Sequence, residues 1–383
     1  MSMNSRERFQ RTMHYQGPDH PPICEFLGFW EETINRWYLE GLPTSIVMST
    51  SGISVYKGSG LSGGRSVSGI PSICEYFGLE TRARLPLDFG PIPRFVNRTL
   101  EDTERYRIEI DESGATRKAM KRGTTIPAFM EFPVKTRADF EKIEERFDPS
   151  DLRRYPLDWG KELIEYYEVA EFPVGIVFPG FFGQGRTWMG LRNLVLCFFR
   201  NPDLIHDMFE FWADFVIEVM KDAVENVKID YAGFWEDMAY RDGPLISPKQ
   251  FGEFMLPYYK KVTSFLRKNG VDVITVDSDG DIDLLIPLFL EAGVNCPYPS
   301  EVQANMDVVE LRKKYGRQLL LIGGIDKRAV AKGPEAIEKE LEHKLPPLME
   351  GGFIPSLDHL VPPDIPLKNY QYYIGLLKKY LLG

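Results

Sequence analysis

Cysteine is scarce in this sequence, and other absences narrow the class of protein further. The chain has 383 residues and four cysteines, too few and too scattered for a disulfide framework or a paired-cysteine metal site. They are Cys24, Cys74, Cys197 and Cys296. No uncharged apolar run approaches the roughly 18 residues of a membrane span. The polar opening residues form no signal peptide, so we expect a cytoplasmic globular protein.

Positive charge is also in deficit. The 46 Lys and Arg residues face 56 Asp and Glu residues, which gives a formal net charge of −10 at pH 7. A chain of this sign is repelled by phosphate backbones and by anionic lipid surfaces. We therefore expect neither nucleic acid nor a membrane as its main partner.

The second half of the chain alternates regularly between strand and helix patterns. Predicted strands are 173–178, 229–235, 271–276, 294–297, 318–322 and 353–355. Predicted helices between and after them are 202–227, 248–268, 281–291, 306–315, 334–348 and 366–380. Such repeating units predict a parallel sheet, either doubly wound or closed into an eight-stranded barrel.

The first half adds one strand of this kind and an insertion. Residues 23–28 give a seventh strand, and we expect the eighth between 71 and 90. Residues 45–72 are rich in Ser and Gly and predict a long loop. Alternating residues at 94–133, with a hairpin signal at 111–114, predict an inserted antiparallel β subdomain. We favour a single (β/α)8 TIM-type barrel domain over 1–383, because residues that carry chemistry follow nearly every strand.

The β-branched strand at 271–276 ends in a cluster of acids. Asp277 and Asp279 are two residues apart, so an extended backbone aims both carboxylates the same way. Two such carboxylates repel each other unless a metal, a proton or a basic group compensates. The alternative is a plain turn at 279–280, with Asp281 as a helix N-cap.

Acids also follow other predicted strands. Glu236 and Asp237 follow 229–235, Asp326 follows 318–322, and Asp358 with His359 follows 353–355. Each acid alone fits a helix cap or a salt bridge, but together they predict a cation site at the edge where the parallel strands end. The glycine-rich segment at 179–186 lacks the GxGxxG order of a nucleotide site.

His359 differs from the other four histidines, which lie in helical stretches or beside a proline turn. Asp277, Asp279, Glu236 and His359 form a mixed oxygen and nitrogen set, which suits Zn²⁺, Mn²⁺ or Fe²⁺. The alternative is that Asp358 and His359 form a structural hydrogen-bonded pair.

The chain resembles the uroporphyrinogen decarboxylase (URO-D) superfamily over nearly its full length. The resemblance rests on six stretches taken in order: 4–9 with 18–19, 180–190, 247–258, the strand that ends at 280, 323–326, and 358–359 with 369–370. It implies a (β/α)8 barrel, and the inserted β segment is more similar to the methyltransferase branch.

Two departures from the family pattern bear on function. Uroporphyrinogen decarboxylases carry a basic segment after the first strand, which holds substrate carboxylates. This chain has the acidic and aromatic segment 25–32 there, which would repel a polycarboxylate. The corrinoid-linked thiol methyltransferases bind zinc through a His-x-Cys pair and a distant Cys. The matching positions here are Asp277-x-Asp279 and the 358–359 segment, a harder ligand set that fits polarising an ether or alcohol oxygen.

The resemblance and these departures imply a methyltransferase. It would take a methyl group from a small O-methyl compound, such as a methoxylated aromatic, and give it to a corrinoid protein. A divalent metal, with zinc favoured, would act as the Lewis acid, held by the catalytic residues Asp277, Asp279, Glu236 and His359. Substrate-binding candidates are Trp30, Glu31, Phe181, Arg186, Trp235 and Tyr240. A uroporphyrinogen-type decarboxylase is the alternative, and a homodimer is a candidate assembly.

Overall fold

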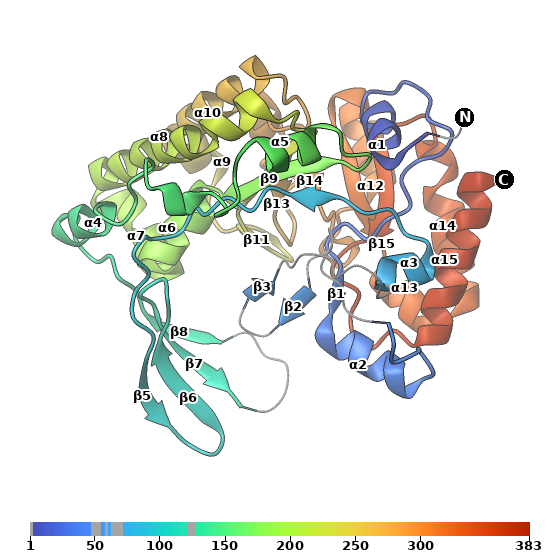
Figure 1. Ribbon diagram of the computed structural model, residues 1–383, viewed down its shortest axis with the longest axis horizontal. Coiled ribbons are helices and arrows are strands. Elements are labelled where there is room, and N and C mark those ends of the chain that lie inside the picture. The colour runs from blue at the N-terminus through green and yellow to red at the C-terminus, as the bar shows by residue number, and fades with distance from the viewer. Residues whose placement is uncertain (1–2, 47–54, 58–59, 63–71, 122–126) are drawn as a thin grey trace.

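Parallel strands alternate with helices through most of this chain. The computed structural model describes residues 3–46, 55–57, 60–62, 72–121 and 127–383 (Figure 1). Five strands form one parallel sheet in the order β14-β13-β10-β9-β4. Their bounds are β4 Ala83–Arg84, β9 Val174–Pro179, β10 Tyr231–Trp235, β13 Ile274–Asp277 and β14 Cys296–Tyr298. The strand expected between 71 and 90 is therefore present as β4.

Two further strands, β15 Leu321–Ile325 and β16 Phe353–Leu357, form a separate parallel pair. Backbone hydrogen bonds from Leu320 N–H to Asn295 O (2.8 Å) and from Gly324 N–H to Pro299 O (2.9 Å) join this pair to the β14 side of the sheet. The described strands form no continuous eight-stranded ladder. The structure therefore confirms a parallel α/β architecture, and it does not confirm the closed barrel.

The predicted strand at 23–28 is wrong. Residues 23–28 carry no strand, and only the two-residue strand β1 Phe29–Trp30 follows them. Pro21 and Pro22 have no N–H to donate to a ladder, and Gly28 has a φ of 97°, which interrupts an extended path. β1 pairs with β2 Val55–Lys57, which pairs with β3 Gly60–Ser62; the rest of the predicted loop up to Pro71 lies mostly outside the described residues.

Helices cover the strands where apolar residues recur on one face. In α8 Pro202–Asn226, the buried residues include Leu204, Met208 and Phe215, and Pro202 occupies the first turn. Figure 1 shows α8 and α10 at one end of the view and α14 and α15 at the other. The helices are α1 Ser5–Met13, α2 Glu31–Leu39, α3 Ile73–Phe77, α4 Arg137–Glu144, α5 Lys161–Glu168, α6 Phe181–Met189, α7 Leu191–Arg200, α8, α9 Pro248–Gln250, α10 Leu256–Lys268, α11 Ile286–Glu291, α12 Val308–Tyr315, α13 Lys327–Lys332, α14 Pro334–Lys344 and α15 Leu367–Leu382. The sequence patterns did not predict α6, α7 or α13.

The buried side chains form two clusters. The larger lies between the sheet and its helices and contains most of the aliphatic and aromatic core. The smaller contains Tyr231, Val273, Tyr298, Ile322 and Ile354, which the successive parallel strands contribute from their other side. The strands thus bury both faces, as their near-continuous apolar sequences predict.

The inserted subdomain is a four-stranded antiparallel sheet in the order β5-β6-β7-β8, as predicted (Figure 1). The strands are β5 Arg98–Asp102, β6 Tyr106–Ile110, β7 Thr116–Met120 and β8 Ala128–Glu131. Asp111 Oδ1 accepts the N–H groups of Ser113 and Ala115 at the turn, where Gly114 has a φ of 86°. Neither face of this sheet joins the main core, and ion pairs such as Arg117 with Glu109 (2.9 Å) cross it.

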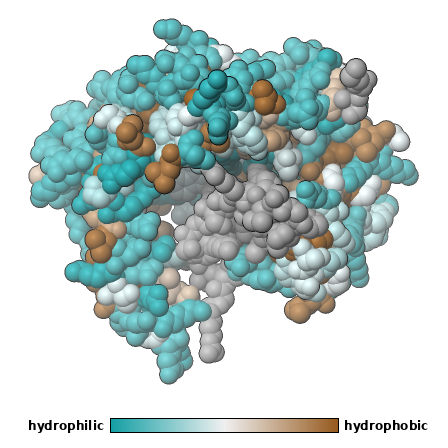
Figure 2. All heavy atoms as spheres, in the orientation of Figure 1, coloured by the Kyte–Doolittle hydropathy of each residue, from teal (hydrophilic) through white to brown (hydrophobic). Residues whose placement is uncertain are grey.

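The face of the molecule shown in Figure 2 is mainly hydrophilic. On the face shown in Figure 2, apolar side chains are scattered rather than gathered into one patch. Among the described residues, every helix is too short or too polar to cross a bilayer.

Candidate active site

Three carboxylates meet where β10 and β13 end. Asp277 is the last residue of β13 and pairs in register with Trp235, the last residue of β10. Its carbonyl oxygen accepts the N–H groups of Glu236 (2.9 Å) and Asp237 (3.2 Å). Since side chains alternate along a strand, Asp277 points to the same side as Val273, at the open end of the smaller core cluster. The charges of Asp237, Asp277 and Asp279 act on one another there.

Asp277 holds a proton near neutral pH. Burial raises its pKa, the negative charges of Asp279 and Asp237 raise it further, and the result is about 8. The positive charges of Arg84 and His359 oppose this rise but do not cancel it. The raised pKa favours a proton on Asp277, which is one of the three ways in which the repulsion between neighbouring acids is compensated.

Arg84, which the sequence reasoning missed, is the cation that acts on Asp277. It lies in the two-residue strand β4, and its buried Nε makes no hydrogen bond within the described residues. Burial lowers the pKa of Arg84, but the neighbouring Tyr298, Tyr231 and Asp277 raise it above the usual value. The available signal was the Arg82-x-Arg84 alternation, which places both side chains on one side of a strand.

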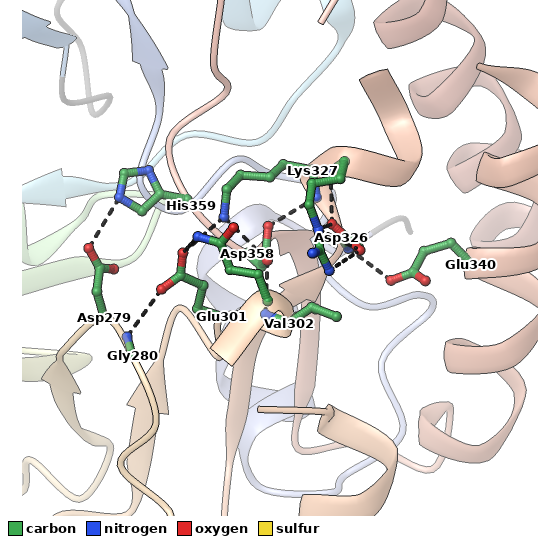
Figure 3. Close-up of polar contacts among 12 residues, drawn as sticks. Asp279, Gly280, Glu301, Val302, Asp326, Lys327, Glu340, Asp358 and His359 are labelled. Atoms are coloured by element: carbon green, nitrogen blue, oxygen red, sulfur yellow. Dashed lines mark hydrogen bonds and ion pairs between the residues drawn. The ribbon is translucent and has the colours of Figure 1, made fainter. Parts of the chain in front are cut away.

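Asp279 and His359 form an ion pair between the loops that follow β13 and β16. The distance from His359 Nε2 to Asp279 Oδ2 is 3.3 Å (Figure 3). The Trp30 ring stacks against the imidazole with centroids 6.5 Å apart. Burial alone lowers the pKa of His359, but the hydrogen bond and charge of Asp279 outweigh it and raise the pKa. Three residues that the sequence reasoning singled out, Trp30, Asp279 and His359, therefore lie together.

Asp237 is the second residue that the sequence reasoning left out of the site. It has a φ of 51°, unusual for a residue with a side chain, and its carboxylate is half-exposed. Arg186 holds it, with 2.8 Å to the Asp237 carbonyl oxygen and 3.2 Å to Oδ2, and the guanidinium lies 5.3 Å from the Trp235 ring centroid. Burial and the charge of Asp279 raise the pKa of Asp237. Arg186 and Trp235 are thus at the site, as predicted.

Glu236 has a different place from the one predicted. Its carboxylate accepts the N–H groups of Phe181 (2.8 Å) and Gly183 (2.7 Å) at the start of α6, and the Tyr259 hydroxyl. Burial raises its pKa to about 7, against these hydrogen bonds, which lower it. The side chain is fully buried and turned away from Asp277, because two main-chain donors and the positive end of α6 hold it. In this structure Glu236 is a buried helix cap.

Phe181 was predicted to bind substrate, but its side chain lies in the core. It is 1% exposed and packs against Phe209, Phe234 and Tyr259, because α6 begins at this residue and turns the ring into the core. Tyr240 is 65% exposed at the rim, and Glu31 begins α2. The sequence also predicted that Trp30, Phe181, Trp235 and Tyr240 line one apolar pocket, and with Phe181 in the core these four aromatics do not form it.

Asp358 and His359 do not pair with each other. The fully buried Asp358 carboxylate accepts the N–H groups of Val302 (2.9 Å) and Lys327 (3.0 Å) and lies 3.5 Å from Lys327 Nζ. Lys327 Nζ also lies 3.2 Å from Glu301, and Glu301 accepts the Gly280 N–H at 3.2 Å. Figure 3 shows the result, a closed ring of contacts through Lys327 that joins the Asp279–Gly280 loop to the Asp358–His359 loop.

The comparison with known proteins identifies the family. The sequence profile described as Uroporphyrinogen decarboxylase (URO-D) matches residues 116–380. The chain belongs to the URO-D family. A Uroporphyrinogen decarboxylase of Pseudoalteromonas atlantica is 26% identical over 209 residues, which are 52% of this chain and 54% of that protein. One from Serratia proteamaculans is 26% identical over 249 residues, 62% of this chain and 67% of that protein. The chain thus spans about half the length of the first of these relatives.

A solved structure shares the fold of this URO-D family member. It is described as a methyltransferase from Methanosarcina mazei, with a TM-score of 0.63, 14% sequence identity and coverage of 99% of both chains. At this identity the likeness establishes the fold alone.

The acidic segment 25–32 of this URO-D family member is mainly structural. Glu25 is buried, and its carboxyl accepts the Leu357 N–H and the Tyr370 hydroxyl, both at 3.1 Å. Burial raises the pKa of Glu25 to about 8. Glu31 and Glu32 lie in the first turn of α2, where negative charge is favourable. Repulsion of a polycarboxylate substrate therefore cannot be assigned to Glu25, contrary to the sequence argument.

The predicted metal ligands do not form a metal site in this conformation. Within the described part of the chain, no group of three or more His, Cys, Asp and Glu side chains is placed to hold a metal ion. Glu236 is committed to α6, and the carboxylate of Asp279 is paired with His359. Zinc at this edge of the sheet stays a prediction.

Proposed function

We propose that this URO-D family member is a methyltransferase that moves a methyl group from a small O-methyl compound to a corrinoid carried by a partner protein. The proposal is carried by the place of Asp277, a carboxyl at the end of β13 beside Asp237, Asp279 and Arg84, where burial and the neighbouring acids raise its pKa to about 8. A departing alkoxide or phenoxide needs a proton, and a carboxyl with a pKa near the working pH is a suitable donor. The fold shared with a methyltransferase over nearly the whole chain supports this reading.

In the proposed step, the bond between the methyl carbon and the substrate oxygen breaks. The methyl group passes to the corrinoid of the partner, and the oxygen keeps the bonding electron pair and takes the Asp277 proton to leave as a hydroxyl. The charges of Arg84 and His359 act on Asp277 and stabilise the carboxylate that remains. Trp30 and Trp235 offer flat apolar surfaces beside these groups for the substrate.

The proposal is tested with purified protein, a reduced corrinoid protein and a set of methoxylated aromatics. We expect the demethylated product by mass spectrometry, in step with the change in corrinoid absorbance. Absence of any demethylated product across this set, with a corrinoid protein that accepts methyl groups from a control enzyme, would contradict the proposal. Metal analysis of the same preparation tests the zinc prediction, and its hydrodynamic mass tests the homodimer.

A decarboxylase is the second candidate, favoured by the buried Nε of Arg84 beside a protonated carboxyl. An arginine in this place can bind a substrate carboxylate by donating hydrogen bonds to it. The curated relatives are also named Uroporphyrinogen decarboxylase. We nevertheless expect no turnover of uroporphyrinogen, because Asp237 and Asp279 add negative charge where a polycarboxylate would enter. Product mass checks this, and decarboxylation at about 1 s⁻¹ or faster would reverse the ranking.

The ring of contacts through Lys327 predicts a positioning role for that lysine. Lys327→Met removes the cation between Glu301 and Asp358, so the loops that carry Asp279 and His359 lose their common anchor. We expect a loss of about 1–3 kcal/mol in the free energy of unfolding and a fall in methyl transfer of about 10²-fold. Urea unfolding and initial rates measure the two effects.

Lys344→Met is the matched control for Lys327→Met. Lys344 is more deeply buried than Lys327, with 1% of its side chain exposed against 15%, and it lies 2.5 Å from both Glu340 and the Gly324 carbonyl oxygen without touching the ring. We expect it to lower stability and to leave the rate within a few-fold of the parent protein. Equal rate losses in the two variants would show that Lys327 acts only through overall stability.

A further inference from the structure

A cavity of about 320 Å³ opens beside Asp279 at the edge where the candidate active site lies. Its wall includes Tyr240, Arg241, Asp279, Glu301 and Arg328. The volume is at the lower end of the range for small-molecule sites, which suits a single substituted ring.

The charges in the wall of this cavity are paired, with one exception. Asp279 is paired with His359, and Glu301 with Lys327. Arg328 is held by both oxygens of Asp326, at 2.9 and 2.8 Å. Arg241 is exposed and makes no ion pair within the described residues, so its guanidinium is available to a ligand in this cavity.

Arg241 is presented on a fixed hairpin. Strands β11 Ala239–Tyr240 and β12 Gly243–Pro244 pair antiparallel, and Arg241 lies in the two-residue turn between them. The Tyr240 carbonyl oxygen accepts the Asp281 N–H at 2.9 Å, which ties the hairpin to the loop that carries Asp279. A Cβ at Gly280 would lie 2.6 Å from that same oxygen, so the close approach requires glycine here. Arg241 and the exposed Tyr240 ring are therefore held beside Asp279.

We infer that Arg241 and Tyr240 form an anion subsite that takes the carboxylate of a ring-bearing substrate. The guanidinium would pair with the carboxylate, and the Tyr240 ring would contact the flat body of the ligand. This inference rests on the proposed function, whose methyl donor it narrows to a methoxylated aromatic acid.

Binding to the protein alone, measured by calorimetry without any corrinoid protein, tests the subsite. The probes are 4-methoxybenzoate and 4-methoxybenzyl alcohol, which have similar shape and differ in charge. We expect the acid to bind more tightly than the alcohol. In Arg241→Met we expect about tenfold weaker binding of the acid, with binding of the alcohol unchanged.

Arg328→Met is the matched control, since Arg328 lines the same cavity but is neutralised by Asp326. We expect it to leave binding of the acid unchanged. The inference would be overturned if the two variants lost equal affinity for the acid, or if acid and alcohol bound equally well. It would also be overturned if neither compound bound, or if millimolar phosphate displaced the acid. Binding of the acid that depends on Arg241, without methyl transfer, would support the subsite and count against the proposed function. Methyl transfer that is unchanged in Arg241→Met would support the proposed function and count against the subsite.

Discussion

Replacing Asp277 with asparagine is expected to lower the rate of methyl transfer by about 10²–10⁴-fold, the usual contribution of a general acid. Asparagine keeps the size and most contacts of the side chain but has no proton of suitable acidity to give to the leaving oxygen. Substrate binding should change little, because the loss falls on the chemical step. Single-turnover kinetics with a corrinoid partner separates the two.

The same substitution is expected to change how stability depends on pH. The usual aspartic acid pKa is near 4, and in the folded protein the pKa of Asp277 is about 8. Between these values the unfolded chain has lost the proton and the folded chain retains it, so stability falls as pH rises from about 4 to about 8 and then levels off. Asp277→Asn removes this contribution. Glu25 and Glu236, with pKa values of about 8 and 7, add slopes of the same sign in both proteins, so the difference between the two proteins is the quantity to measure.

Asp281→Asn is the control for both measurements. Its carboxylate accepts the Asp283 N–H in a turn of the same loop and takes no part in the proposed chemistry. We expect parent-like rates and the parent pH dependence of urea unfolding. A rate for Asp277→Asn within tenfold of the parent would remove Asp277 as the proton donor, and an unchanged pH slope would contradict its raised pKa.

The strands that the sequence predicted well are those in which composition alone decides the outcome. Val271 to Val276 is nearly all β-branched and is followed by acids and glycine, and β13 ends at Asp277 as expected. β4 could be expected only because a barrel needs eight strands and seven had been predicted. Its two residues are too few to make a periodic pattern. Residues 23–28 have strand composition, but Gly28 and the preceding prolines prevent a ladder, and local propensity is a weak guide to such cases.

The part of the site that could be predicted is the meeting of Asp279, His359, Trp30 and Arg186 near Asp277. It follows from the rule that parallel strands end at a common edge. Asp237 could not be predicted, because a positive φ places it and leaves no pattern in the sequence. Arg84 was missed because its strand has only two residues, and the alternation with Arg82 was the one signal for it. Of the two adjacent acids Glu236 and Asp237, the sequence argument assigned Glu236 to the site. In the structure the backbone turns Asp237 toward the other carboxylates instead.

The glycine-rich segment after β9 explains the error over Glu236. Glycine lowers helix propensity, so no local pattern indicates that α6 begins at Phe181. A Cβ at Gly180 would lie 2.1 Å from Glu236 Oε1, and a Cβ at Gly183 would lie 2.4 Å from the Trp235 carbonyl oxygen. These glycines allow the start of α6 to approach the carboxylate, a tertiary requirement that no local pattern reports.

This geometry predicts a large loss of stability for Glu236→Ala. The change leaves the buried N–H groups of Phe181 and Gly183 and the hydroxyl of Tyr259 without an acceptor. Each buried donor without a partner costs about 1–3 kcal/mol, so for three donors we expect a total loss of about 3–9 kcal/mol in the free energy of unfolding. Urea unfolding followed by circular dichroism measures it.

Two further substitutions show whether the loss comes from the cap. Glu236→Gln keeps one acceptor oxygen but turns an NH₂ group toward a donor, so we expect a smaller loss than for alanine. Glu253→Ala removes an exposed carboxylate from the neighbouring π-helix Phe251–Met255 and should leave stability unchanged. If Glu236→Ala instead unfolds like the parent and loses a bound metal ion together with activity, Glu236 is the ligand that the sequence predicted. The contacts of Glu236 with the start of α6 would then belong to the metal-free protein alone.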